Sequence, residues 1–240
     1  MSMGWRPNIS DDRDWDYGQI ATRTPIKSKV DLTSTLPHYL LQGNAPSCVG
    51  HAIAHQLWCE ESSRSLYRTS VPSRGYIWAM ARASHQANIQ MTGTYPRLAY
   101  KAVQKLGCPP ESKWPYRKST YCTMPNDVAR RWAMSRRGLQ YYTIKQNRSD
   151  AIRQALTENH PVTIGTRVFP AMRKYKRGEI LHRPFVNEQL NGGHYMCIMG
   201  YEQDHFIVVN SWRGKEVMLF HEDIIEWSKS GDFTVVTGWA

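Results

Sequence analysis

The sequence predicts an α+β fold with two lobes, a mainly helical lobe followed by a mainly β lobe. First, apolar residues recur at helical spacing from about Cys48 to Leu106. Second, the chain from Pro161 onward consists of short apolar or β-branched runs bounded by Gly, Asn or Asp, which is typical of strands. Because the helices precede the strands instead of alternating with them, a parallel βαβ sheet is not expected. A cleft between two such lobes is a favoured place for a functional site.

The length of 240 residues allows one large domain or two small lobes packed together. Hydrophobic residues make up 41% of the chain, which is enough to bury a core and excludes wholesale disorder. Apolar runs of about 18 residues are missing and the first eight residues hold no apolar segment, so neither a transmembrane helix nor a secretory signal is expected. We therefore expect a soluble protein made in the cytoplasm. Its final compartment stays open, because lysis or a dedicated delivery system could export it.

The positive charge is concentrated in one part of the chain. The formal net charge is +11, and residues 113–183 alone contain 16 basic and 4 acidic side chains. Such a patch suits an acidic partner, a nucleic acid or an anionic surface. No recognisable nucleic-acid motif accompanies it. We interpret it as a solvated basic face and expect neither a nucleic-acid partner nor membrane binding.

Residues 1–35 are predicted to form an extended N-terminal arm, because they are polar, rich in Asp and interrupted by Pro7 and Pro25. The sequence leaves open whether this arm covers the cleft, braces the second lobe or is removed.

Residues 36–115 are predicted to form the helical lobe. One helix begins at Cys48, after a Gly-Asn-Ala-Pro turn. Ser73 is suited to cap a second helix. A third helix carries apolar residues every four positions from Leu98 and ends at Gly107.

Residues 116–240 are predicted to form the β lobe. One helix is expected first, from Ser149 to Asn159, and Pro161 ends it. The expected strands are Pro161–Val168, His194–Tyr201, Phe206–Asn210, Val217–Phe220 and Phe233–Thr237.

The cysteines indicate neither a disulfide framework nor a structural zinc site, since their number is odd and no Cys-x-x-Cys pair occurs. Cys59 and Cys197 lie in apolar runs, where cysteine is most often a small buried hydrophobic residue. Cys108 and Cys122 flank a Pro-rich turn, and the sequence leaves open whether they form a bridge. Cys48 differs from these four because it opens a helix.

Four polar residues indicate nucleophilic catalysis. Cys48 lies at a helix N-terminus, where the helix dipole and free N–H groups favour a thiolate. His194 starts one predicted strand and Asn210 ends the next, so antiparallel pairing can place them side by side. In a Cys–His–Asn site the imidazole takes the thiol proton and the Asn carbonyl orients the ring. Gln42, shortly before the nucleophile, is suited to join the Cys48 N–H in holding an oxyanion, and one such donor is typically worth about 3 kcal/mol.

In chain order, these motifs resemble those of the papain-like cysteine peptidases. The segments that carry the resemblance are Gln42-Gly43-x-x-x-Ser47-Cys48, Gly93-Thr94-Tyr95-Pro96, Trp114-Pro115-Tyr116, Gly192-Gly193-His194 and Asn210-Ser211-Trp212. The opening is similar to that of shorter bacterial and viral members in Gly4-Trp5-Arg6-Pro7, Arg13-Asp14 and Val30-Asp31-Leu32. The resemblance covers essentially the whole chain.

The resemblance implies a papain-like fold, with a helical left lobe, an antiparallel β-barrel-like right lobe and the active site in the cleft. It implies hydrolysis of a protein or peptide substrate through a thioester, by a monomer that needs no metal or organic cofactor. The implied catalytic residues are Cys48 as nucleophile, His194 as base and then acid, Asn210 as orienting residue and Gln42 as oxyanion donor. The implied substrate-binding residues are Gly93, Thr94, Gly193 and Trp212, of which Trp212 is also expected to cover the Asn–His hydrogen bond.

The sequence departs from the family pattern at several positions. Val49 replaces the usual aromatic residue after the nucleophile, Ala45 replaces a cysteine of a common bridge, and Thr94 replaces a second glycine. The loop after Trp212 is shorter than usual, which puts the floor of the substrate pocket in doubt. The family's long inhibitory propeptide is also missing, since only about thirty residues precede Val30.

Two other functions fit the same sequence. A deamidase, isopeptidase or acyl transferase acting on one dedicated protein would use the same residues, and a non-catalytic binding module would use the basic face. His51 and His55 have the spacing of a zinc pair on a helix, but they lack the intervening Glu and an evident third ligand, so metal binding is the less favoured interpretation.

Overall fold

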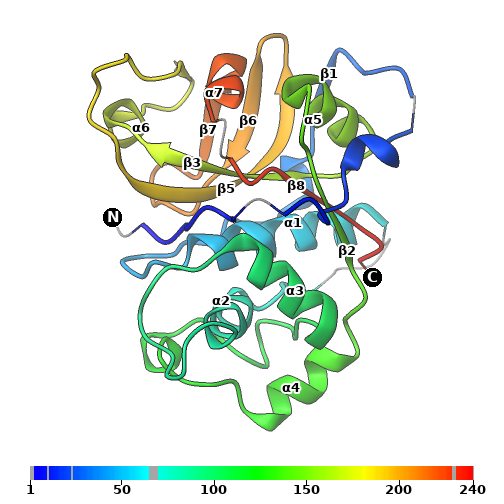
Figure 1. Ribbon diagram of the computed structural model, residues 1–240, viewed down its shortest axis with the longest axis vertical. Coiled ribbons are helices and arrows are strands. Elements are labelled where there is room, and N and C mark those ends of the chain that lie inside the picture. The colour runs from blue at the N-terminus through cyan, green and yellow to red at the C-terminus, as the bar shows by residue number, and fades with distance from the viewer. Residues whose placement is uncertain (1–2, 10, 23, 65–69, 229–230, 240) are drawn as a thin grey trace.

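The computed structural model has two lobes with α1 between them, and it describes residues 3–9, 11–22, 24–64, 70–228 and 231–239 (Figure 1). The helices are α1 (Cys48–Arg64), α2 (Arg74–Ala83), α3 (Pro96–Leu106), α4 (Asp127–Met134), α5 (Arg148–Thr157), α6 (Pro170–Lys174) and α7 (Glu222–Trp227). The strands are β1 (Lys29–Asp31), β2 (Gln140–Thr143), β3 (Val162–Val168), β4 (Ile180–Leu181), β5 (Asn191–Glu202), β6 (His205–Val209), β7 (Val217–His221) and β8 (Thr234–Thr237). None of the helices in the described part of the chain combines the length and apolar character needed to cross a bilayer.

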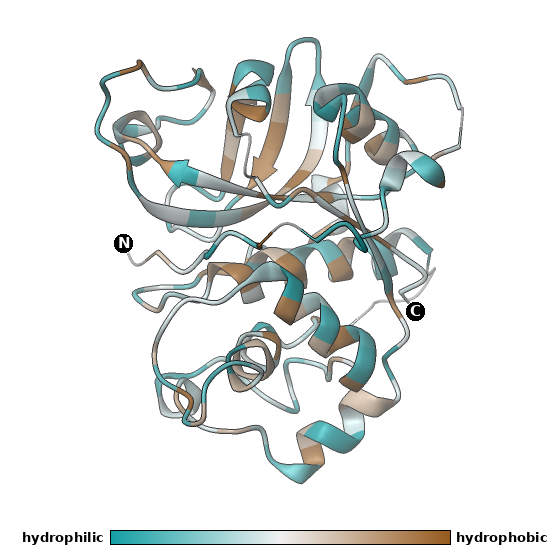
Figure 2. Ribbon diagram, viewed as in Figure 1, coloured by the Kyte–Doolittle hydropathy of each residue, from teal (hydrophilic) through white to brown (hydrophobic). Residues whose placement is uncertain are grey.

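Helix α1 is the buried axis of the molecule. Its residues from Cys48 to Glu60 are all buried, because α2 packs on one side and β5 on the other. A helix enclosed in this way needs no polar face. Figure 2 shows hydrophobic residues along the central strands and on parts of the helices, and mainly hydrophilic residues on many of the outer loops. The burial of α1 places its first residue, Cys48, at the boundary between the lobes.

The sheet positions the histidine and asparagine candidates. Its strand order is β2-β8-β3-β5-β6-β7-β4, and β1 pairs with β5. In the antiparallel β5–β6 pair, Cys197 is opposite Val209. Asn210, the next residue, therefore comes diagonally across from His194, within reach of a side-chain contact.

Most of the predicted elements are confirmed. A helix begins at Cys48, Ser73 caps α2 through its side chain, and α3 ends at Gly107, whose φ of 78° suits glycine. The predicted helix from Ser149 is α5, and each of the five predicted strands is present. Helix α3 and strand β7, which are buried on one face, carry apolar patterns that match this burial.

The structure also corrects the sequence-based description. The sheet is mixed, since β4 pairs with β7 in parallel, whereas an antiparallel lobe was expected. Helix α4 was not predicted, and it packs on the helical lobe through Ala129 and Ala133, although the division at residue 115 assigned it to the β lobe. Cys108 and Cys122 form no disulfide within the described residues, which answers the question that the sequence left open.

Candidate active site

Cys48 lies at the start of α1, with its side chain fully buried. The backbone N–H groups of Tyr195 and Gly4 lie near the sulfur and favour its charged form. Because Tyr195 follows His194 in β5, this contact brings the first turn of α1 against the strand that carries the histidine. The free N–H groups of a helix start also favour negative charge on sulfur.

His194 and Asn210 form the central hydrogen bond of the site. His194 Nε2 lies 2.7 Å from Asn210 Oδ1, and the backbone N–H of Ser211 donates to the same oxygen at 2.8 Å. Because the Asn oxygen only accepts, His194 Nε2 carries the proton and Nδ1 keeps a lone pair. This buried Nδ1 has no hydrogen-bond partner among the residues that the structure describes. The ring of Trp212 stacks on the imidazole, with centroids 4.3 Å apart and an angle of 22° between the planes.

Gln42 is joined to this pair through Ser211. Ser211 Oγ donates to Gln42 Oε1 at 2.7 Å, and the backbone N–H of Gln42 donates to Ser211 O at 3.0 Å. Since its oxygen is engaged in this way, the Gln42 amide nitrogen faces the loop before Cys48, where it donates to Ala45 O at 2.9 Å. Gln42, Asn210 and His194 therefore lie in one hydrogen-bonded group, and Cys48 lies at the start of the helix that packs on the strand of His194.

Sequence reasoning did not assign two residues that support this group. Ser211 bridges Gln42 and Asn210, as described above. The Tyr116 hydroxyl donates to Gln42 O at 2.8 Å and lies 2.6 Å from Ser47 Oγ. Both residues stand inside motifs that the sequence analysis quoted, but no local pattern shows which partner their hydroxyl groups contact.

Burial holds the thiol and the imidazole in their neutral forms. It raises the pKa of the Cys48 thiol to about 11, although nearby N–H groups oppose the shift. It lowers the pKa of His194 to about 4, although the hydrogen bond to Asn210 opposes this shift. Burial therefore disfavours the charged form of each of these two groups in the closed site.

The first described part of the chain runs between the two lobes, as Figure 1 shows. Its residues 3–8, called here the cleft segment, pair in parallel with Thr94: the Thr94 N–H donates to Gly4 O at 2.8 Å, and the Arg6 N–H donates to Thr94 O at 3.1 Å. On the other wall, the Trp5 N–H donates to Gly193 O at 3.3 Å. The backbone groups expected to bind a substrate are thus occupied by the chain's own N-terminal region.

Trp5 and Asp232 anchor the cleft segment. The indole lies so close to the sheet that a Cβ at Gly165 or Gly193 would come within 2.2 Å or 2.5 Å of it. Trp5 Nε1 donates to Asp232 Oδ2 at 2.7 Å, and the backbone N–H of Asn8 donates to the same oxygen at 3.0 Å. Burial raises the pKa of Asp232 to about 6, although these hydrogen bonds oppose the shift.

The next part of the arm contacts α3, where Asp14 pairs with Arg97, and later parts contact the β lobe. Strand β1 pairs with β5, and the Tyr17 hydroxyl donates to Glu158 at 2.7 Å. The arm therefore covers the cleft and braces the second lobe, two of the alternatives that the sequence left open.

The two histidines of α1 do not form a zinc pair. His55 Nε2 accepts the Leu40 N–H at 2.8 Å, and His51 Nδ1 lies 2.9 Å from Ser47 O. Both rings are buried against these backbone groups. Their role in this structure is to hold the chain before α1.

Comparisons with known proteins agree with this geometry. The sequence profile of a family described as papain family cysteine protease matches residues 80–217, which include His194 and Asn210 but not Cys48. A protein of Acanthamoeba polyphaga mimivirus, described as an uncharacterised peptidase C1-like protein, is 28% identical over 226 residues, which are 90% of this chain and 69% of that protein.

Two solved structures show the same fold. Xylellain, a cysteine protease from Xylella fastidiosa, superposes with a TM-score of 0.84 at 24% identity, over 100% of this chain and 97% of that one. A procathepsin B from Trypanosoma congolense superposes with a TM-score of 0.71 at 12% identity, over 100% of this chain and 86% of that one.

Proposed function

The chain belongs to the papain family of cysteine proteases, and from this premise we propose that it hydrolyses peptide bonds through a thioester formed on Cys48. The observation that carries the proposal is the buried hydrogen bond between His194 Nε2 and Asn210 Oδ1, at 2.7 Å. It holds the ring in the tautomer whose Nδ1 lone pair is left to accept a proton. The nucleophile candidate stands at the helix start beside the same strand.

The proposed reaction has two steps. His194 Nδ1 takes the Cys48 proton, the sulfur attacks the substrate carbonyl carbon, and the amine leaves with the proton from the imidazolium. Water then attacks the thioester, with His194 again as base, and the acid is released while the thiol is restored. The Gln42 amide and the Cys48 N–H hold the oxyanion in both steps, and Asn210 keeps the ring oriented.

We also propose that the chain is latent while the cleft segment is in place. Gly4 and Arg6 already use the hydrogen bonds of Thr94 that a substrate backbone would use. The same segment excludes water from Cys48, so the thiol and imidazole remain neutral. Displacing it would admit solvent and substrate together, and the ion pair could then form.

The Gly4 carbonyl group is not placed for attack by the thiol. Its oxygen is engaged by the Thr94 N–H. A carbonyl that is attacked directs its oxygen at the oxyanion donors, so the bond between Gly4 and Trp5 is not in the cleavage position.

The test is cleavage of quenched fluorescent peptides and of a denatured protein, with intact-mass analysis of the products. Because the cleft is closed, each substitution is made in the natural chain and in a chain that also carries Gly4→Ala, which removes the cleft segment by steric clash. We expect Cys48→Ala and His194→Ala to abolish turnover. Cys122→Ser is the matched control, since this exposed cysteine lies outside the site, and it should retain full activity.

Alkylation by iodoacetamide, mapped to individual cysteines, gives a second measurement that needs no substrate. In the Gly4→Ala chain, Cys48 should react at acidic pH, and His194→Ala should remove this reactivity. Substantial turnover by Cys48→Ala would overturn the assignment. A mass gain of about one dalton without fragments would replace hydrolysis of peptide bonds by deamidation.

A further inference from the structure

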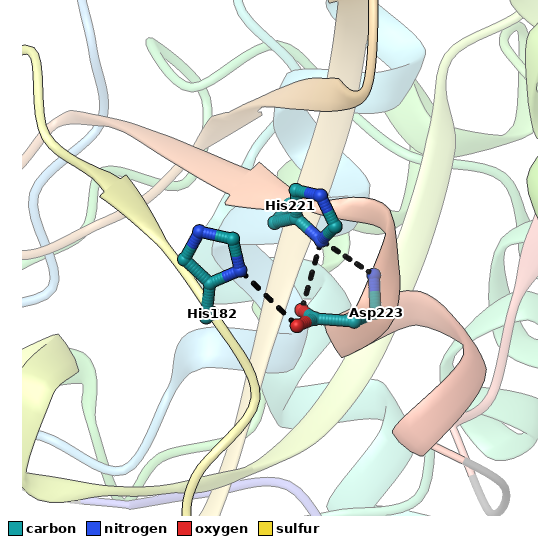
Figure 3. A group of neighbouring side chains, drawn as sticks. All are labelled: His182, His221 and Asp223. Atoms are coloured by element: carbon teal, nitrogen blue, oxygen red, sulfur yellow. Dashed lines mark hydrogen bonds and ion pairs between the residues drawn. The ribbon is translucent and has the colours of Figure 1, made fainter.

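Three metal-ligating side chains meet at the edge of the sheet, outside the candidate active site: His182, His221 and Asp223 (Figure 3). The parallel pairing of β4 with β7 aligns Leu181 with Phe220, so the histidines that follow these residues come side by side. Asp223 lies in the first turn of α7 and turns its carboxylate toward both rings. The group therefore results from strand register and not from a local motif.

The donor atoms lie near the separations that a small tetrahedral cation requires. His182 Nδ1 lies 3.2 Å from Asp223 Oδ2, and His221 Nδ1 lies 3.3 Å from Asp223 Oδ1. One ligand atom from each residue lies within 4.8 Å of the other two. Zinc bonds of about 2.0–2.2 Å to nitrogen and oxygen place neighbouring ligands roughly 3.3–3.5 Å apart. The His182 side chain is 60% exposed, so it is free to rotate and close the longest separation.

Hydrogen bonding within the group leaves one contact unsatisfied. His221 Nδ1 accepts the backbone N–H of Asp223 at 3.2 Å, which requires an unprotonated nitrogen. The same nitrogen faces the Asp223 carboxylate at 3.3 Å, where an unprotonated nitrogen is repelled. A proton on Nδ1 would suit the carboxylate and oppose the N–H, so neither protonation state satisfies both contacts. A cation shared by Nδ1 and the carboxylate removes the repulsion, at the cost of the hydrogen bond from the Asp223 N–H.

Polar groups of neighbouring residues lie beside these ligands. Asp204 Oδ2 lies 3.6 Å from Nε2 of His221, the ring nitrogen that the cation would not use, a separation longer than a direct hydrogen bond. A carboxylate on the second nitrogen is the usual support of a metal-bound histidine. The Arg183 N–H donates to Asp223 Oδ1 at 3.0 Å. The rings of His182 and His221 lie 4.3 Å apart and 33° from parallel.

We propose that His182, His221 and Asp223 bind a transition-metal ion of the zinc class, with a fourth position open to solvent. Two imidazoles and one carboxylate suit Zn²⁺ or Co²⁺, whereas Ca²⁺ and Mg²⁺ take mainly oxygen ligands. The ion joins the segment after β4 to the end of β7 and the start of α7, so it stabilises this edge of the sheet. The group shares no residue with the candidate active site, and the proposal therefore stands apart from peptidase activity.

The test is a calorimetric titration of the full chain with Zn²⁺, followed by the absorption spectrum with Co²⁺. We expect one ion per chain, and affinity about tenfold or more weaker in Asp223→Asn and His182→Gln. His38→Gln removes an exposed histidine outside the group and is the matched control, with unchanged affinity. Zn²⁺ should also raise the thermal unfolding midpoint of the natural chain and of His38→Gln by more than that of Asp223→Asn.

Co²⁺ separates this site from adventitious binding to thiols. Tetrahedral nitrogen and oxygen ligands give visible d–d bands without the sulfur-to-cobalt charge-transfer band that Cys48 or Cys122 would add. Equal zinc uptake by Asp223→Asn and the natural chain would overturn the proposal, as would bound cobalt with only thiolate character. No uptake by the natural chain would overturn it as well. His182→Gln keeps the test decisive if Asp223→Asn fails to fold, because His182 is an exposed side chain.

Discussion

Replacing Trp5 by alanine should open the cleft. The indole is 5% exposed and lies against the backbone at Gly165 and Gly193, where any added side chain would collide with it. Its Nε1 also makes the hydrogen bond to Asp232. Because the indole belongs to the cleft segment and the surfaces around it belong to the folded body, Trp5→Ala weakens docking of the segment more than it weakens the body.

The magnitude follows from the burial of the indole. Truncating a buried Trp to Ala costs about 3–5 kcal/mol. Each 1.4 kcal/mol is a factor of about ten in an equilibrium constant. A loss of about 3 kcal/mol thus raises the ratio of open to closed chains by roughly 100-fold. The specificity constant for a peptide substrate should rise by the same factor, until most of the chains are open.

The assay compares kcat/KM on a quenched peptide with the alkylation rate of Cys48, for the natural chain, Trp5→Ala and Trp15→Ala. Trp15 is the matched control, since it lies in the same arm but is 59% exposed, and its ring contacts Tyr142. An exposed substitution changes stability by at most about 0.5 kcal/mol, so Trp15→Ala should stay within about twofold of the natural chain.

Closure of the cleft by the Trp5 indole is contradicted if Trp5→Ala matches the natural chain in both measurements while its circular dichroism shows an intact fold. The cleft segment would then not limit access to Cys48. Equal activation by Trp5→Ala and Trp15→Ala would also contradict it, because the effect would come from loosening the arm in general and not from the buried indole.

Three further substitutions test other parts of the argument. Gly4→Ala places a methyl group 2.0 Å from the Pro46 carbonyl oxygen, so it should accelerate alkylation of the nucleophile as the tryptophan change does, and an unchanged rate would contradict the pose of the segment. Ser211→Ala leaves the buried Gln42 oxygen without its hydroxyl donor, a loss of about 1–3 kcal/mol, so steady-state kinetics of the opened chain should show kcat reduced about tenfold with little change in KM. For Asp232, the pKa of about 6 in the folded chain exceeds the ordinary value of 3.8. Between these pH values the folded chain holds the proton and the unfolded chain does not. The free energy of unfolding therefore falls as pH rises through this window, by up to about 3 kcal/mol. Asp232→Asn should lose this pH dependence. The measurement is the urea unfolding midpoint of the variant near pH 4 and near pH 7. If the two midpoints still differ as they do in the natural chain, the dependence does not come from this carboxyl group.

Some helices could be predicted from the sequence because burial of one face produces a regular spacing of apolar residues along the chain. Helix α3 repeats its apolar residues and ends where Gly107 adopts a φ of 78°. Helix α4 could not be predicted in this way, because it buries only Ala129 and Ala133 while Val128 and Trp132 are exposed. Its large apolar residues lie on the face that is exposed to solvent, and the buried face carries only small residues. The hydrophobic pattern of the sequence therefore does not indicate which face is buried.

The group of His182, His221 and Asp223 lies beyond the reach of sequence patterns for a different reason. It depends on the pairing of β4, a strand of two residues, with β7. A strand of two residues is too short to show an alternation of apolar and polar residues. Its parallel partner is distant in the chain, so the residues near β4 do not indicate the pairing. Only the folded sheet brings these side chains together.

By itself, the sequence determined the order of the helices and strands and the residue types that a Cys–His–Asn site needs. Both can be identified from short runs of neighbouring residues. The tertiary structure decided the state of that site. Burial moves the pKa of Cys48 to about 11 and that of His194 to about 4, and Gly4 closes the cleft on Thr94. Desolvation and contacts between distant segments set these properties, because both depend on the whole set of atoms around a group and not on the residues beside it in the chain.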